Sequence, residues 1–202
     1  MGFYVVNNSR FDNNGFSYGE EKGKVNTGDA IFCTECDSPL TMLEWLPPFE
    51  VKLSKGQLGD VIFGTYNHFI VSEKFKELYQ KNRFTGILTF EPVSLYQKGK
   101  PIIDKYYCPK IGLSDVHIDI DKSGVVFDGI EECSTCQKAG RVIKKINGLY
   151  INSDSRMNDD IFCTMMLPGD IIFSERFKEN AKDLLNLSFI QAEHYVPSWV
   201  VI

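Results

Sequence analysis

The sequence predicts an α+β fold made of two related β-rich halves, each with an amphipathic helix on a mostly antiparallel sheet. Three observations support this prediction. Short stretches alternate apolar and polar residues as strands do, helical periodicity is limited to two places, and residues 60–93 and 160–196 loosely repeat each other. We expect the halves to span residues 1–110 and 111–202 and to pack as one compact unit.

The first half opens with strand patterns. Residues 3–6 (FYVV) are apolar and β-prone, and residues 49–53 (FEVKL) alternate as a half-buried strand does. A helix is expected after Ser72, and residues 87–93 return to a strand pattern. Trp45 precedes two prolines, and we expect it to pack over the first cysteine turn rather than to anchor a partner.

The repeat is clearest at the two helices. Both copies contain Ser-Glu-basic-Phe-Lys-Glu, beginning at Ser72 and Ser174, where an N-cap belongs. The expected buried faces are Phe75, Leu78 and Tyr79 in the first helix and Phe177, Ala181, Leu184 and Leu185 in the second. Capping alone does not require this match, and a C-x-x-C pair lies about 24 residues upstream of each copy. We therefore interpret the repeat as an internal duplication.

The second half contains more strand patterns, at residues 106–111 (YYCPKI), 116–120 (VHIDI) and 124–130 (GVVFDGI). The segment DKSG between the last two predicts a hairpin turn, and Asn-Gly at 147–148 predicts another. The apolar residues 195–202 (YVPSWVVI) predict a final buried strand.

Composition restricts the class of protein. The chain of 202 residues is 43% apolar and 24% charged, and a chain of this length buries about 70% of its unfolded surface without needing disulfides. No apolar run approaches the ~20 residues of a membrane span, and the first residues lack a secretory pattern, so we expect a cytoplasmic protein with no membrane partner. The net charge of −5 argues against nucleic-acid binding and suits a basic protein partner.

Four of the six cysteines form two C-x-x-C pairs, Cys33 with Cys36 and Cys133 with Cys136. Four thiolates supplied as two pairs match a structural zinc site, which is closed to water and does no chemistry. Redox chemistry is a second interpretation, but a thioredoxin-like pair opens a helix, and here a Pro or a Gly soon follows each pair. Buried thiols without a metal are the third. Cys108 and Cys163 lie in apolar stretches and are expected to be core residues.

No catalytic motif is evident, so we do not expect an enzyme. The sequence contains no nucleophile elbow, P-loop or dinucleotide fingerprint. Asp115, His117 and Asp119 alternate along a strand pattern and could face a metal together. We favour a solvated strand face instead, with Val116, Ile118 and Ile120 buried behind it.

An ordered series of motifs resembles a known family. The first C-x-x-C pair is followed by WLPPFEVKL at 45–53, Gly-Asp at 59–60 and FIVSEKFKELYQKNRFTGILTFEPV at 69–93. This order is similar to the double-CxxCG motif immunity protein family, contact-dependent toxin immunity proteins of myxobacterial type. The resemblance covers residues 30–95 and, more loosely, the second pair and the repeat copy after it.

The resemblance implies an immunity protein, an antitoxin that neutralises a cognate toxin domain by stoichiometric binding. Together with the cysteine pairs, it implies a zinc ion that joins the two halves. The acidic surface would suit a basic toxin. The family has glycine after the second cysteine of each motif, where this chain has Asp37 and Gln137. Both residues must adopt a turn that glycine adopts more readily.

The residues are also compatible with two other functions. A zinc-ribbon-type nucleic-acid-binding protein would need a basic face, for which the candidates are residues 98–100 (KGK) and 141–145 (RVIKK). A thiol oxidoreductase would use the C-x-x-C pairs directly.

Overall fold

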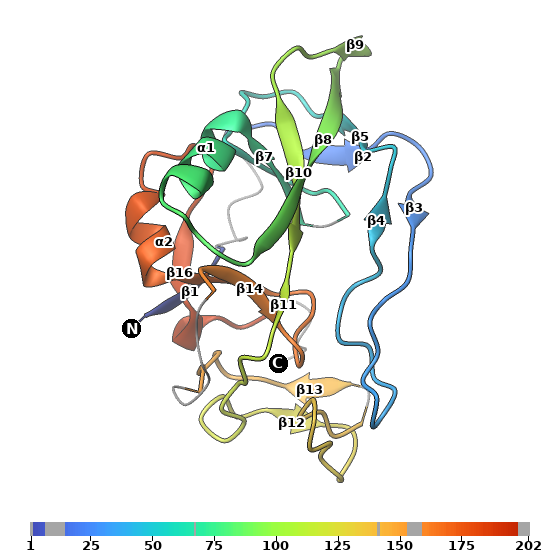
Figure 1. Cartoon of the computed structure of the whole chain (residues 1–202), viewed down its shortest axis with the longest axis vertical. Coiled ribbons are helices and arrows are strands. Elements are labelled where there is room, and N and C mark those ends of the chain that lie inside the picture. The colour runs from blue at the N-terminus through green and yellow to red at the C-terminus, as the bar shows by residue number, and fades with distance from the viewer. Residues whose placement is uncertain (1, 7–14, 67, 141, 153–158, 198–202) are drawn as a thin grey trace.

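The structure, a computed structural model, describes residues 2–6, 15–66, 68–140, 142–152 and 159–197. The fold is mostly β, with helices α1 (Glu73–Lys81) and α2 (Glu175–Asn180) and a 3-10 turn, η2 (Ala192–His194). The two α-helices lie side by side on one flank of the molecule (Figure 1). No helix in the described part of the chain is long and apolar enough to cross a bilayer.

Two mixed sheets form the body. The first has the order β11 (Leu113–Ser114), β14 (Ile161–Thr164), β15 (Ile171–Ser174), β1 (Phe3–Val6) and β16 (Phe189–Gln191). The second has the order β2 (Gly19–Glu21), β5 (Glu50–Leu53), β8 (Ile87–Gln97), β10 (Tyr106–Ile111), β7 (Phe69–Ser72) and β6 (Val61–Phe63), with β9 (Lys100–Pro101) paired to β8. Short pairs form between β3 (Asn26–Thr27) and β4 (Trp45–Leu46), and between β12 (Val126–Phe127) and β13 (Ile143–Lys145).

Each sheet contains a strand–strand–helix–strand unit. We name β6, β7, α1 and β8 the first unit, and β14, β15, α2 and β16 the second unit. In both units a strand from elsewhere in the chain lies between the second and third strands. Strand β10 lies between β7 and β8, and β1 lies between β15 and β16. The second unit is thus completed by a strand that precedes the first unit in the chain.

The helices begin at the serines that the sequence predicts. The hydroxyl of Ser72 accepts a hydrogen bond from the Phe75 N–H at 3.2 Å, and the hydroxyl of Ser174 accepts one from the Phe177 N–H at 3.1 Å. Each cap satisfies an N–H group that has no partner inside the helix. Helix α2 ends at Asn180, earlier than expected from its apolar pattern. Ala181 and Leu184 are nevertheless buried, whereas Leu185 is 46% exposed.

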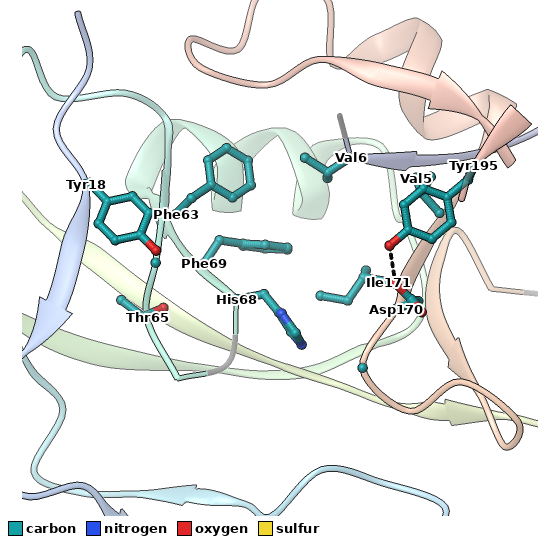
Figure 2. A pocket seen from close by; sticks show the side chains of 12 residues that line it. Val5, Val6, Tyr18, Phe63, Thr65, His68, Phe69, Asp170, Ile171 and Tyr195 are labelled. Atoms are coloured by element: carbon teal, nitrogen blue, oxygen red, sulfur yellow. Dashed lines mark hydrogen bonds between the residues drawn. The ribbon is translucent and has the colours of Figure 1, made fainter. Parts of the chain in front are cut away.

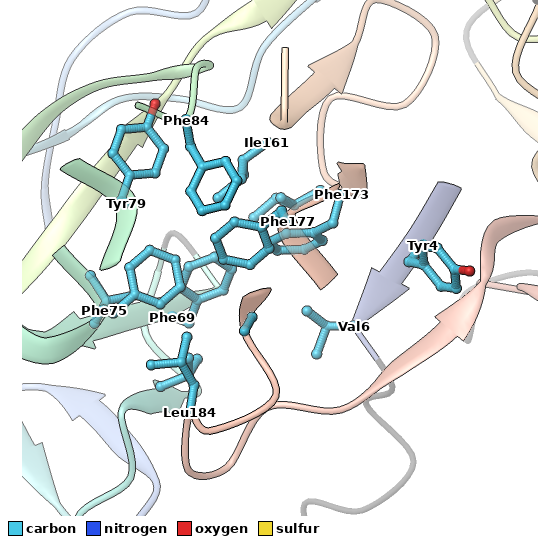
Figure 3. Packing of buried hydrophobic residues seen from close by; sticks show 14 of the residues in the cluster. Tyr4, Val6, Phe69, Phe75, Tyr79, Phe84, Ile161, Phe173, Phe177 and Leu184 are labelled. Atoms are coloured by element: carbon cyan, nitrogen blue, oxygen red, sulfur yellow. The ribbon is translucent and has the colours of Figure 1, made fainter. Parts of the chain in front are cut away.

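One aromatic core lies between the two units. Figure 3 shows Phe75 of α1 next to Phe177 of α2, with ring centroids 5.5 Å apart. Phe84 and Phe173 contact the Phe177 ring at 5.1 and 5.4 Å. Burying each such ring stabilises the fold by roughly 1.5–3 kcal/mol. Residues of both predicted halves therefore share this core, and the boundary expected after residue 110 falls within β10.

Asp60 connects the start of the first unit to the turn after α2. Its carboxylate accepts hydrogen bonds from the Ser72 hydroxyl at 2.7 Å and from the Leu185 N–H at 2.8 Å. The Asp60 N–H donates to the Leu185 carbonyl at 2.9 Å. Lys74 forms an ion pair with the same carboxylate at 3.2 Å. The buried Asp60 carboxylate therefore holds the turn after α2, which belongs to the other unit, against the start of the first unit.

Asp160 makes the reciprocal connection, from the second unit to the turn after α1. Its carboxylate accepts from the Ser174 hydroxyl at 2.7 Å, the Thr85 N–H at 3.1 Å and the Arg176 Nε at 2.9 Å. The Asp160 N–H donates to the Thr85 carbonyl at 3.1 Å. We call the hydrogen bonds of Asp60 and Asp160 the aspartate junction. Both aspartates belong to the sequence repeat, but their role in joining the two units could not be predicted from it.

The hairpin expected around residues 121–124 does not form. The chain turns there, with the Ser123 N–H donating to the Asp119 carbonyl at 2.9 Å, but the segments on either side pair elsewhere. Strand β12 pairs with β13, and Ile118 makes an isolated bridge with Ile151. The buried Ser123 explains this choice, because its hydroxyl accepts from the Tyr150 N–H at 2.9 Å and draws that distant segment to the turn.

Trp45 lies in a different place from the one expected. Its side chain is 1% exposed, and it packs against Phe49 in the core of the second sheet, with ring centroids 5.1 Å apart, and not over the cysteine turn. The exclusion of Trp45 as an exposed anchor is correct. Of the final strand expected at residues 195–202, positions 198–202 lie outside the described residues.

Candidate metal centre

A long arm carries the first C-x-x-C pair away from the body. Residues 28–44, which we call the arm, connect β3 to β4 and extend down the molecule to the end that holds β12 and β13 (Figure 1). The second pair lies in the loop between β12 and β13. The tip of the arm therefore meets a segment about a hundred residues later in the chain.

The four cysteines predicted as metal ligands come together there. We name Cys33, Cys36, Cys133 and Cys136 the cysteine cluster; their sulfur atoms all lie within 4.8 Å of one another. The closest cross-pairs are Cys33 with Cys133 at 3.7 Å and Cys36 with Cys136 at 3.4 Å. Tetrahedral zinc with ~2.3 Å bonds separates its sulfur ligands by about 3.8 Å. The cluster therefore has the donor set and dimensions of a four-thiolate metal site.

Both cysteine turns have the same backbone geometry. In the arm, the Asp37 N–H donates to the Cys33 carbonyl at 3.0 Å, and the Cys33 N–H donates to the Ser38 carbonyl at 2.9 Å. In the second turn, the Gln137 N–H donates to the Cys133 carbonyl at 2.9 Å. These bonds fold each pair back on itself, so that both sulfurs of a pair point to the same side.

Asp37 and Gln137 adopt a turn conformation that favours glycine. Their φ angles are +57° and +61°, in the left-handed region. That region costs a residue with a Cβ roughly 1–2 kcal/mol relative to the right-handed one. The departure from glycine therefore leaves the shape of the turns intact at an energetic cost.

The electrostatics of the cluster favour a bound cation. Burial raises the pKa of Cys136 to about 12, so the thiol resists ionisation by itself. Hydrogen bonds from Ser38 lower the pKa of the exposed Cys36 thiol to about 6. Lys138 is 9% exposed, its ammonium donates to the Pro39 carbonyl at 2.6 Å, and burial lowers its pKa. A metal ion would supply the positive charge that the buried thiolates need.

Glu35, inside the first spacer, links the two turns and was missed by the sequence analysis. Its carboxylate accepts from the Ser134 hydroxyl at 2.9 Å and from the Thr135 hydroxyl at 2.8 Å. The hydrogen bonds from Thr135 and Ser134 lower the Glu35 pKa. The Cys133 thiol also donates to it, at 3.3 Å. An acid in one spacer (CTEC) and two hydroxyl residues in the other (CSTC) were the available signal.

The remaining candidate residues lie apart from the cluster. Cys108 is fully buried, as expected for a core thiol, whereas Cys163 is only half-buried and packs at the edge of the aromatic core. Asp119 forms an ion pair with Lys122 at 3.0 Å. In the part of the chain that the structure describes, the cysteine cluster is the one group of three or more His, Cys, Asp or Glu side chains with ligand spacing.

The alternative functions find little support in this geometry. Neither C-x-x-C pair opens a helix, which is the arrangement that activates a thioredoxin-like thiol. The exposed lysines of the two basic segments, Lys98 and Lys100 near β9 and Lys144 and Lys145 on β13, lie at opposite ends of the long axis (Figure 1). They cannot form one continuous basic face.

Comparisons with known proteins identify no relative of this chain. No protein-family model matches the chain, and no curated protein matches it.

Proposed function

We propose that the cysteine cluster holds one structural zinc ion, which fastens the arm to the loop between β12 and β13. The observation that carries this proposal is the meeting of two matched cysteine turns at tetrahedral sulfur spacing. Zinc with four protein ligands has no open position for water or substrate, so its role is structural. Three of the four ligand residues are buried, which protects such a site from exchange.

We propose further that the chain arose by internal duplication, with the first strand of each copy exchanged into the other. The cysteine turns, the aspartates of the junction and the capping serines all recur at nearly constant separation. The exchanged strands also match. Lys76 lies over the Tyr107 ring at 3.9 Å, and Lys178 lies over the Tyr4 ring at 4.6 Å. Tyr107 on β10 pairs with β7 as Tyr4 on β1 pairs with β15.

On this scaffold we propose that the protein is an immunity protein that neutralises a basic toxin domain by one-to-one binding, without catalysis. The motif series at residues 30–95 and the net charge of −5 support it. A groove of about 320 Å³ between the arm and the body adds support, because its rim exposes apolar side chains. Met42, Leu43 and Leu88 are 46%, 45% and 73% exposed. Exposed apolar side chains gathered at a groove are typical of protein-binding surfaces.

Two measurements on one purified sample test these proposals. The metal content should be one zinc per chain, and should fall when Cys136 is replaced by serine. Calorimetry should give one-to-one binding to the toxin domain encoded beside this chain, with a Kd on the order of 1 nM, as in tight inhibitory complexes. One zinc without toxin binding would leave the metal centre standing and reject the immunity function. Toxin binding by a protein that contains no zinc would reject the metal site and keep the immunity function.

A further inference from the structure

A second cavity, unrelated to the cysteine cluster, lies where the two units meet. Its volume is about 220 Å³, and its lining includes Val6, Tyr18, Thr65, His68, Asp170 and Tyr195. Figure 2 shows Asp170 and Tyr195 on one side of the cavity and Tyr18 and Thr65 on the other, with His68 and Phe69 between them. A cavity of this size is smaller than typical small-molecule sites of about 300–1,000 Å³, and it suits a single side chain.

Asp170 places an incompletely paired carboxylate in this cavity. Oδ1 accepts a hydrogen bond from the Tyr195 hydroxyl at 2.5 Å. Within the described residues, Oδ2 accepts no hydrogen bond, and no lysine or arginine forms an ion pair with Asp170. Burial raises the Asp170 pKa, which means that the folded protein disfavours its charge. A cation entering the cavity would relieve that cost.

The rest of the lining matches a side chain with an apolar stem and a charged tip. Phe63, Phe69 and Ile171 present apolar surface, and the Tyr195 ring stands beside the carboxylate. Aromatic faces attract a nearby ammonium group. On the opposite side, Thr65 is 5% exposed, and its buried hydroxyl has no hydrogen-bond partner within the described residues.

We propose that this cavity receives the ammonium group of a lysine side chain from a partner protein. Because Oδ1 already accepts from Tyr195, Oδ2 is the more open oxygen of Asp170, and a single close contact suits the point charge of lysine better than the two-pronged guanidinium of arginine. The methylene stem lies against the apolar wall formed by Phe63, Phe69 and Ile171. This inference rests on the proposed function in one respect, because it identifies the partner as the basic toxin.

The test uses small probes and needs no toxin. Nα-acetyl-lysine amide is titrated into the ¹⁵N-labelled protein and compared with Nα-acetyl-norleucine amide, which has the stem without the charge, and with Nα-acetyl-arginine amide. The expected Kd for lysine is on the order of 1–10 mM, as suits one side chain without the rest of an interface. Shifts should be confined to amides near Asp170, Thr65 and Phe69. Norleucine and arginine should each bind at least about tenfold more weakly.

Two variants locate the binding group. Asp170→Asn retains an acceptor for Tyr195 but removes the charge, and should weaken lysine binding at least about tenfold. Asp104→Asn makes the same change of charge between β9 and β10, at a residue that does not line the cavity, and should leave binding unchanged.

Several results would overturn the proposal: no localised shifts, equal binding of norleucine, or equal binding by the Asp170→Asn variant. If that variant does not fold, the comparison of lysine with norleucine on the original protein decides. Lysine binding together with a failure to bind the toxin would reject the immunity function and keep the site.

Discussion

The aspartate junction and the cysteine cluster both join distant parts of the chain, but by different physical means. Asp60 and Asp160 are buried acids whose hydrogen-bond partners are all supplied by the protein. The cysteine cluster brings together four thiols that attract one another only weakly. The junction is therefore complete after folding alone, whereas the zinc ion that we propose would complete the cluster. On that proposal, the body of the protein can be stable on its own and the arm would depend on metal.

Replacing Asp160 with alanine should have the largest effect. It removes the acceptor for Ser174, Thr85 and Arg176 inside the protein, and breaking a buried charged network costs about 3–5 kcal/mol. Urea unfolding at unchanged m-value measures the loss. The adjacent, half-buried Asp159 is the matched control, and its replacement by alanine should have much less effect. Equal losses in the two variants would mean that the junction is not a main support of the fold.

Removing zinc should have the next largest effect. At a free zinc concentration of about one hundred times the Kd, the ion contributes about 2.7 kcal/mol, which a chelator should abolish. Hydrogen exchange should then show loss of protection at residues 31–40 and 130–140, with protection retained at α2. Loss of protection at α2 as well would show that the cluster supports the whole fold and that the two regions are not independent.

Lowering the pH should separate the two regions. Burial alone would raise the Asp160 pKa, but hydrogen bonds from Arg176, Ser174 and the Thr85 N–H hold it below 3.8 overall. Because the folded pKa is depressed, the stability that the Asp160 carboxylate contributes is complete at neutral pH and is lost as the pH falls through that depressed value. Thiolate ligands release zinc when they are protonated, and this occurs at a higher pH than the protonation of Asp160.

We therefore expect zinc release, followed with a chromogenic chelator, to precede the loss of near-UV circular dichroism. The Asp160→Asn variant should lack the stability change below pH 3.8 that Asp160 produces. Simultaneous loss of zinc and tertiary signal would contradict the separation.

The smallest effect concerns the cysteine turns themselves. Gln137→Gly removes the strain of a left-handed residue, partly offset by the entropy of glycine, for a gain of about 0.5–1 kcal/mol. The gain should appear in thermal unfolding of the zinc-loaded protein and vanish after chelation. Lys98→Gly relieves the same strain far from the cluster, at a residue with φ +51°. It should stabilise the protein to thermal unfolding with or without zinc. A Gln137→Gly gain that is independent of zinc would mean that the turn is rigid without metal.

The sequence reveals local features of this fold better than long-range ones. The helix starts at Ser72 and Ser174 follow from short-range capping rules, and both cysteine turns could be recognised from spacing. The end of α2 could not, because the chain after Asn180 leaves the helix to bring the Leu185 N–H to Asp60. A short apolar, β-prone run such as FYVV at 3–6 identifies a strand but carries no information about its partner.

The candidate site divides in the same way. The four ligands could be named from the sequence because C-x-x-C is a local signal. The carboxylate of Glu35 could not be assigned, since its partners Ser134 and Thr135 lie 99 and 100 residues away. Asp170 and Thr65 share a cavity for a similar reason, because the packing of the two units, and no motif, brings them together.

The pairing of β1 with β15 and β16 has a consequence during synthesis on the ribosome. Residues 3–6 are translated long before their neighbours, which begin at residues 171 and 189. At about 5–20 residues per second, β1 waits on the order of 10–30 s before either neighbour is synthesised. During that interval this apolar strand lacks its native pairing partners. The nascent chain is thus vulnerable to misassembly until both neighbouring strands have been translated.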